Sequence, residues 1–213
     1  MAGATSVRGM TEDASTPNAV RKIELPESQA LATLASVFED LQYVLRCCEH
    51  LVTALGGPES GPVRVATDDA LVEALWTGAL VGYVRCFSPR TAVLTDADAA
   101  AVELPGEIAA ADFHGMLKKL RDHYASRHTN PREAFTIGAA QSNSGDLMGV
   151  AVVSAPRPIV DDTTVRLLGR LAYSLSATID ARMQEAQNTV LGVVKDMSRL
   201  QLSSLPLVHL ADA

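Results

Sequence analysis

The stretch ESQALATLASVFEDLQYVLRCCEHLVTAL, residues 27–55, decides the fold class of this chain. Its apolar residues recur at steps of three and four positions, which is the period of a helix with one buried face. They are Leu31, Leu34, Val37, Phe38, Leu41, Val44, Leu45 and Leu51. Gly56-Gly57-Pro58 follows and ends the pattern. The stretch predicts a long amphipathic helix that other helices must cover.

A second, more apolar helix is predicted from the N-cap cluster Thr67-Asp68-Asp69 to about Phe87. It is apolar on nearly all sides, which predicts a place in the centre of the bundle. Gly78 and Gly82 lie four positions apart and would let a neighbouring helix come close. Arg85 is the one charged residue in its later half. That arginine is interpreted either as a salt-bridged or snorkelling residue at the helix end, or as a phosphate ligand.

Further helical segments follow Ser88-Pro89. A short piece is predicted from about Asp96 to Val102, and a longer helix from about Ile108 to Arg127. The buried stripe of the longer helix is expected to consist of Phe113, Met116, Leu117, Leu120 and Tyr124. Asn130-Pro131 ends this helix, because a residue that precedes proline is disfavoured in the helical conformation.

The period then changes to that of a strand. Apolar and β-branched runs flank the turn sequence Gln-Ser-Asn-Ser-Gly-Asp, which predicts a β-hairpin at about residues 134–155. Asp161-Asp162-Thr163 caps a helical pattern over about 162–203, roughly 60 Å long if unbroken. Gln187-Asn188 and Gly192 are the expected places for a kink or break. A stripe of this length exceeds what a small bundle covers, so part of it is expected to pack on a second copy.

Composition also favours a mainly helical fold. The chain is 47% hydrophobic but only 4% aromatic, so its core consists mostly of Ala, Val and Leu, which suits closely packed helices. We predict one helical domain at residues 27–205, an up-and-down bundle with the hairpin inserted before a long last helix. A flexible arm at 1–26 and a tail at 206–213 flank it, and Arg21 to Leu25 could pair as a short strand.

Charge and cysteine content exclude several classes of protein. The formal net charge of −7 argues against non-specific coating of nucleic acid, which relies on many Lys and Arg contacts. Cys47 and Cys48 are adjacent and Cys86 is alone, so the sequence has neither a disulfide framework nor a CxxC metal pattern. Reduced cysteines and the lack of a signal-peptide pattern predict a cytoplasmic protein. No apolar run reaches the ~20 residues that a membrane-spanning helix needs.

The segment LKKLRDHYASRHTN, residues 117–130, is a basic island on this acidic chain. Arg121 and His128 are seven positions apart, about 700° round a helix, so both side chains leave nearly the same face. RNA cleavage needs a base for the 2′-hydroxyl and a cation for the charge that develops at phosphorus, and these are roles of histidine and arginine. In the competing interpretation the segment is a solvated face on which His128 caps the end of the helix.

At Arg121, Asp122 and His128 the sequence resembles the HEPN superfamily, helical-bundle proteins of prokaryotic toxin, abortive-infection and RNA-processing systems. The signature of that superfamily is an arginine, a polar residue, a variable gap and a histidine, written R-x(4–6)-H. The upstream helix ALWTGALVGYVRCF, residues 74–87, also resembles the partner helix of HEPN-like, abortive-infection-related proteins. The resemblance covers roughly residues 27–131.

The resemblance implies a metal-independent endoribonuclease of a toxin or phage-defence system that acts as a homodimer. Arg121 would hold the scissile phosphate, His128 would act as acid or base, and Asp122 would orient them. The side chains expected to contact the RNA substrate are Arg85, Lys118, Tyr124 and Arg127. Its expected partners are an RNA substrate, a second copy of the chain, and an antitoxin or regulatory protein.

No cofactor and no metal site are expected. His114 and His128 lie too far apart on one helix to share an ion, and the sequence has no spacing of the HExxH type.

Two other functions stay open at this point. The first is a non-catalytic, HEPN-like helical dimer that serves as a binding or scaffold protein. The second is a small-molecule sensor, because residues 147–183 resemble the closing strand and helix of GAF-type domains. A GAF-type domain requires a sheet of at least five strands, so the number of strands separates these interpretations.

Overall fold

The computed structural model describes residues 19–55, 69–125, 135–154 and 160–208. Its helices are α1 (Pro26–Leu55), α2 (Asp69–Arg85), α3 (Asp96–Ala100), α4 (Ala110–Ala125), α5 (Asp162–Lys195) and α6 (Arg199–Ser204). Its strands are β1 (Val20–Arg21), β2 (Phe135–Gln141), β3 (Leu147–Ser154) and β4 (Leu207–Val208). The predicted fold class, mainly α with a small hairpin before a long helix, is confirmed.

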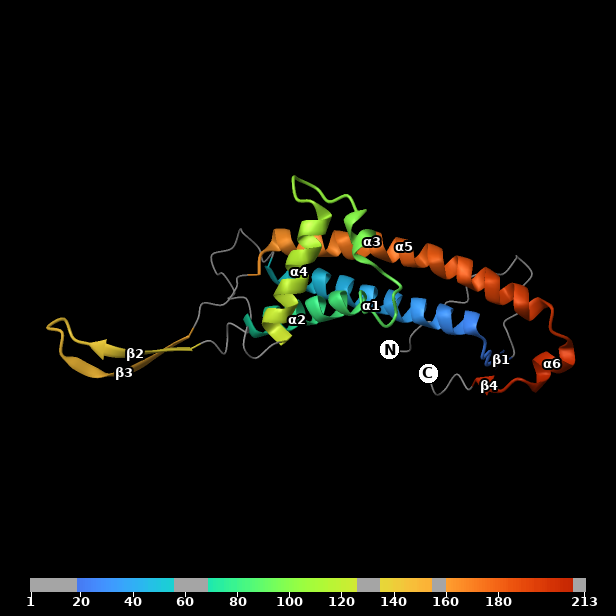
Figure 1. The fold of residues 1–213 in the computed structure, drawn as a ribbon, viewed down its shortest axis with the longest axis horizontal. Coiled ribbons are helices and arrows are strands. Elements are labelled where there is room, and N and C mark those ends of the chain that lie inside the picture. Colours follow the sequence, from blue (N-terminus) through green and yellow to red (C-terminus); the bar gives the residue numbers. More distant parts are fainter. Residues whose placement is uncertain (1–18, 56–68, 126–134, 155–159, 209–213) are drawn as a thin grey trace.

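The centre of the bundle is α1, with α5 along one side and α2 along the other, while α4 crosses α2 (Figure 1). The fully buried side chains come from all four of these helices and include Leu41, Leu80, Leu117 and Leu168. The central place predicted for α2 is therefore wrong. Its Leu71 is half exposed, because the described helices that pack most on α2 lie on the sides that face α1 and α4.

The two glycines of α2 lie where α1 comes close, as predicted. A Cβ atom at Gly78 would lie 2.6 Å from the Tyr43 hydroxyl oxygen, and one at Gly82 would lie 3.2 Å from Val44 Cγ2. Both distances are shorter than van der Waals contact. The absence of side chains at these two positions therefore lets the ring of Tyr43 lie against α2.

The last helical pattern breaks later in the chain than the positions expected for a kink or break. The predicted helix over about 162–203 is two helices, since α5 ends at Lys195 and α6 begins at Arg199, whereas the expected kink positions lie inside α5. Ser198 accepts a hydrogen bond from the backbone of Gln201, and the Gln201 side chain accepts one from the backbone of Ser198. This capping box starts a new helix, because its hydrogen bonds replace those that would continue α5.

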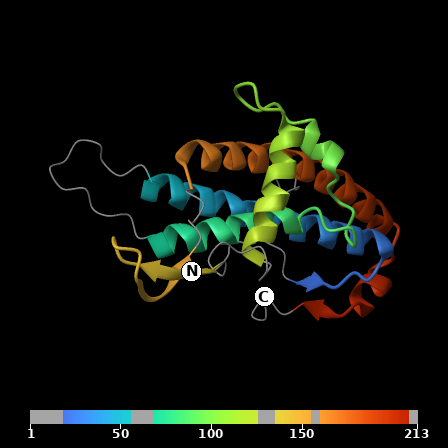
Figure 2. The same ribbon diagram turned by 60° about the vertical axis from the view of Figure 1, so that its left-hand side comes forward.

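The arm and the tail meet in the fold. β1 pairs antiparallel with β4, with Val20 opposite Val208, and it shares only Arg21 with the strand predicted from Arg21 to Leu25 (Figure 2). The Arg21 side chain also donates to the carbonyl oxygen of Leu205, at 2.6 Å. Residues 1–18 and 209–213, the outer parts of the predicted arm and tail, lie outside the described residues.

The β2–β3 hairpin projects beyond the ends of the helices (Figure 1). Its strands pair antiparallel with each other, from Phe135 opposite Ser154 to Gln141 opposite Leu147. In the described part of the chain the strands form two separate two-stranded sheets. The GAF-type interpretation, which needs five strands in one sheet, is therefore wrong for these residues. None of the described helices is both long and apolar enough to cross a membrane.

Candidate active site on helix α4

The motif arginine lies about one turn before the C-terminal end of α4. Its Nε lies 3.0 Å from the Asp122 carboxylate, so the residue expected to orient Arg121 does contact it. The contact lacks hydrogen-bond geometry, and within the described residues this buried Nε has no hydrogen-bond partner. The Arg121 side chain as a whole is 38% exposed. His128 and Arg127, the other members of the predicted site, lie outside the described residues, and the distance from Arg121 to His128 stays a prediction.

Two of the predicted substrate-binding cations are already engaged within the chain. Lys118 Nζ lies 3.1 Å from both carboxylate oxygens of Asp96. Arg85 makes a two-pronged ion pair with Asp40 of α1, with 2.8 Å between Nε and Oδ2. Arg85 is thus the salt-bridged arginine of the more conservative interpretation, and it points to α1 rather than to Arg121. The remaining candidate, Tyr124, is partly buried and packs on the core, and this burial raises the pKa of its hydroxyl.

A buried histidine network lies beside this segment and was not predicted. The Tyr83 hydroxyl is 2.7 Å from His114 Nδ1, and His114 Nε2 is 3.0 Å from Asp96 Oδ1. Tyr83 is 0% exposed and His114 3% exposed. The Phe87 ring packs on the imidazole with 4.5 Å between ring centroids. These contacts join α2, α4 and the first residue of α3, so the network positions the helix that bears Arg121.

One tautomer of His114 gives each neighbour in this network a hydrogen bond. Burial raises the pKa of Tyr83, which keeps its hydroxyl protonated and able to donate. His114 Nδ1 then accepts, and its Nε2–H donates to Asp96. Hydrogen bonds from His114 and Lys118 hold the pKa of Asp96 below its usual value. Asp96 is thus a carboxylate beside both the His114 ring and the Lys118 ammonium group.

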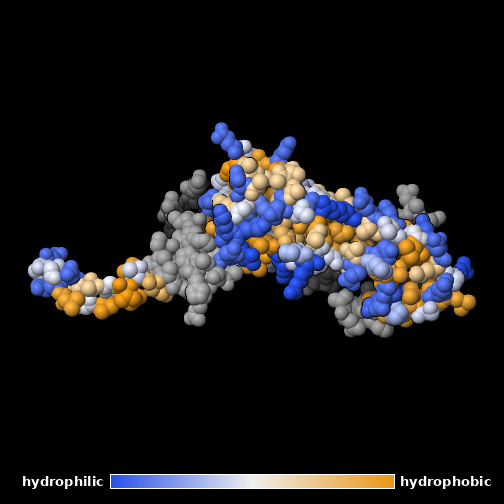
Figure 3. Space-filling model, viewed as in Figure 1, coloured by the Kyte–Doolittle hydropathy of each residue, from blue (hydrophilic) through white to orange (hydrophobic). Residues whose placement is uncertain are grey.

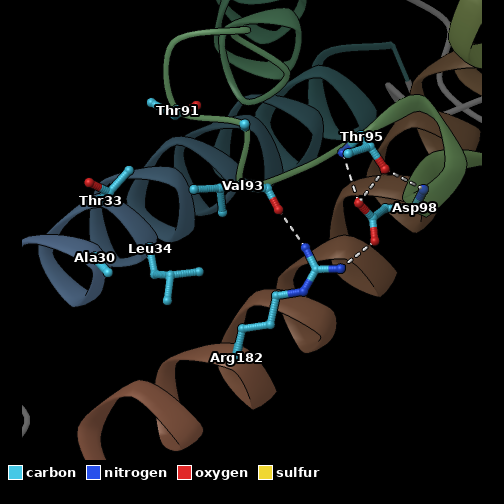
Figure 4. Close-up of a pocket in the computed structure, with 9 residues that line it drawn as sticks. Ala30, Thr33, Leu34, Thr91, Val93, Thr95, Asp98 and Arg182 are labelled. Atoms are coloured by element: carbon cyan, nitrogen blue, oxygen red, sulfur yellow. Dashed lines mark hydrogen bonds and ion pairs between the residues drawn. The ribbon is translucent and has the colours of Figure 1, made fainter. Parts of the chain in front are cut away.

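A second polar cluster lines a cleft of about 560 Å³ between α1, the α2–α3 loop and α5 (Figure 4). Arg182 of α5 donates to the backbone oxygen of Val93 and to the carboxylate of Asp98. Thr95 caps α3 through the backbone and side chain of the same Asp98. Ala92, which also lines the cleft, has φ of 48°, in the left-handed region that alanine rarely adopts. Arg182 therefore fastens a strained loop and the start of α3 to α5.

Arg182→Met is expected to lower the free energy of unfolding by about 2 kcal/mol at pH 7. This loss of stability is smaller than for a fully buried ion pair, because solvent reaches 37% of the Arg182 side chain. Burial alone would raise the pKa of Asp98, but Arg182 and Thr95 together lower it. A carboxyl with a lowered pKa stabilises the folded state above its unfolded pKa. The difference between variant and wild type in urea titrations should therefore shrink as the pH falls below about 3.8.

A control for this prediction is Arg166→Met, also on α5. Arg166 pairs with Asp162 at 60% exposure, so its loss should cost far less stability than the loss of Arg182. Equal effects of the two variants, or a difference for Arg182→Met that does not depend on pH, would contradict the assigned role.

No group of three or more His, Cys, Asp or Glu side chains in the described ranges is arranged to hold a metal ion. Comparison of the chain with protein-family models, with curated proteins and with solved structures finds no match. The function must therefore be argued from the residues of α4 and their surroundings.

Proposed function

We propose that this chain is a metal-independent endoribonuclease of the HEPN type, from a toxin or phage-defence system, and that it acts as a dimer. Arg121 holds the scissile phosphate, Asp122 orients Arg121, and His128 acts as acid or base. Under this proposal the 2′-hydroxyl loses a proton to a histidine and attacks phosphorus. The 5′-oxygen leaves with a proton from a second acid, which yields a 2′,3′-cyclic phosphate and a 5′-hydroxyl.

The observation that best supports this proposal is the state of Arg121. Three other cations form ion pairs with carboxylates of other elements, namely Arg85, Lys118 and Arg182. Arg121 contacts only its sequence neighbour among the acids of the described chain, and its buried Nε has no hydrogen bond there. A desolvated donor without a partner costs free energy, so it favours an incoming acceptor. A phosphate oxygen is an acceptor suited to a guanidinium.

The geometry of α4 supports the proposal as well. Tyr83 and Asp96 fix His114 seven residues before Arg121, on the same ridge of the helix. An arginine on a helix anchored in this way is preorganised, and a preorganised cation stabilises developing charge better than a mobile one.

The test is cleavage of end-labelled RNAs by the purified chain in the presence of EDTA. Wild type is expected to release products with cyclic phosphate ends, and Arg121→Ala should slow cleavage at least thirtyfold, as expected when an arginine that binds the transition state is lost. His128→Ala should do the same. Arg199→Ala is the matched control, because Arg199 is exposed on α6 and should leave the rate unchanged. If wild type leaves varied RNAs intact, the proposal is wrong.

A non-catalytic, HEPN-like scaffold is the second candidate function. The observation that favours it is the engagement of the basic residues, since Arg85 and Lys118 are held by carboxylates and Arg121 has Asp122 beside it. Each of these acids lowers the attraction for an anionic substrate. A folded dimer that neither cleaves RNA nor binds it at low salt would support this second function.

A further inference from the structure

The two strands of the β2–β3 hairpin carry no charged residue and expose large apolar side chains to solvent. The exposed fractions lie between 57% and 75% for Phe135, Ile137, Leu147, Met148, Val150, Val152 and Val153. Figure 3 shows this surface as a continuous hydrophobic stretch with hydrophilic residues confined to the turn. Scattered apolar residues on a surface are ordinary, but a contiguous set marks an interaction site.

The register divides these side chains between two different faces. Residues that lie opposite each other point to the same side of a hairpin, and successive residues alternate. Ile137 is opposite Val152 and Ala139 is opposite Val150, so this face is large and apolar. Gly138, Ala140, Gly149 and Ala151 alternate with them on the other face, which is therefore mostly flat. The first set, together with Phe135, is called the large face below.

An isolated hairpin with this composition requires a partner. Two-stranded hairpins are at best marginally stable in water unless something covers an apolar face. β2 and β3 pair with each other and with no other described strand, so no described strand covers either outer edge. Natural proteins protect such edges with charges, prolines or covering elements, and these two strands contain neither a charge nor a proline.

We propose that the large face of this hairpin packs on the same face of a second copy of the chain. A two-fold contact is self-complementary, so a face with no charge fits its own copy without leaving a charge buried. A charged partner such as RNA or an acidic peptide would find no counter-charge on these strands. A second copy of the chain, by contrast, offers an uncharged face of the same size.

The large face supplies part of the area that such an interface needs. A fully exposed large side chain offers roughly 100 Å² of apolar surface. The four large side chains of this face, which are 57–75% exposed, would then remove on the order of 250 Å² per hairpin, and about 500 Å² for two hairpins. That total is about half of the lower limit expected of a specific protein–protein interface, so the two copies need a further contact beside the hairpins.

The position of the hairpin links the dimer contact to RNA cleavage. Only this link rests on the proposed function. Ten peptide steps separate Ala125, at the end of α4, from Phe135, at the start of β2. A fully extended chain of that length spans at most roughly 35 Å. Pairing of two hairpins therefore limits how far apart the two α4 helices can lie, and the proposed function requires the Arg121 side chains of both copies to serve one cleft.

The test measures the dissociation constant of the full chain by sedimentation equilibrium in two lysine variants. Val152→Lys places a charge on the large face and is expected to raise the constant at least tenfold. Val153→Lys is the matched control. Val153 is also a valine and is 58% exposed, compared with 64% for Val152, but it points to the other face of the hairpin. It should change the constant less than threefold. Circular dichroism should show unchanged helix content in both, since both side chains are exposed.

Cross-linking provides a second measurement that does not depend on dissociation. The three natural cysteines are buried, so a cysteine introduced on the hairpin would be the reactive one. Oxidation should join two chains of Ile137→Cys and leave Thr136→Cys on the opposite face mostly monomeric. A monomeric wild type at 50 µM, or equal effects of the two lysines, would overturn the inference. A dimer that is weakened by Val152→Lys but cleaves no RNA supports the inference and contradicts only the proposed function.

Discussion

Replacing His114 with leucine is expected to lower the free energy of unfolding by about 3 kcal/mol. The change leaves the Tyr83 hydroxyl without its acceptor at a position that is 0% exposed, and an unpaired buried donor costs about 1–3 kcal/mol. The bond to Asp96 is lost as well, but that carboxylate is 70% exposed and water replaces the donor. Leucine retains much of the contact with Phe87, so the polar part of the effect dominates.

A double-mutant cycle separates this polar effect from a change in packing. Tyr83→Phe removes the hydroxyl that His114→Leu leaves unpaired, so the two changes together should cost at least 1 kcal/mol less than their sum. Urea titrations of wild type, both single variants and the double variant give the coupling free energy. Strictly additive losses would show that the hydrogen bond at 2.7 Å does not connect α2 to α4.

The secondary structure was largely predictable because the burial pattern of each helix is local. The periodicity of residues 27–55 predicted α1 to within one residue, and the alternation at 134–155 predicted the hairpin with the same precision. The end of α1 is marked by Gly56-Gly57-Pro58. The hairpin is marked by its polar turn and by the prolines that follow it. The position of α2 was wrong because an apolar composition shows that a helix can be buried, but not which helix lies at the centre.

The break before α6 was overlooked although the sequence contains its signal. Ser198 and Gln201 have the spacing of a capping box, and that motif overrides an apolar stripe that continues through it. Periodicity alone extended the helix, since Leu200 fits the stripe of α5. In the structure Leu200 is among the most exposed apolar residues.

The contacts of the candidate site could not be predicted from periodicity, because they join residues that are distant in sequence. Arg85 and Asp40 are 45 positions apart, and Tyr83 and His114 are 31 apart. Sequence reasoning considered His114 only as a metal ligand. The signal that could have shown its role is its spacing of four and seven residues before Lys118 and Arg121 on one ridge.

Leu168→Ala is expected to lower the free energy of unfolding by about 3–4 kcal/mol, a loss as large as that expected for His114→Leu. Leu168 is 0% exposed, in the half of α5 that packs on α1, and close neighbours on that half leave little room for the cavity to collapse. Deletion of a fully buried leucine side chain costs the transfer free energy of the lost methyl groups together with that of the cavity. For a chain of this size the melting temperature should fall by roughly 10 °C.

The control for this prediction lies on the same helix. Leu191→Ala makes the same change in the later half of α5, where Leu191 is 47% exposed, and should cost less than about 1 kcal/mol. A large difference between the two variants means that the first half of α5 provides the packing of the bundle. Equal losses would instead mean that the later half is covered by a surface other than the described helices, and a second copy of the chain would then have to bury that half as well.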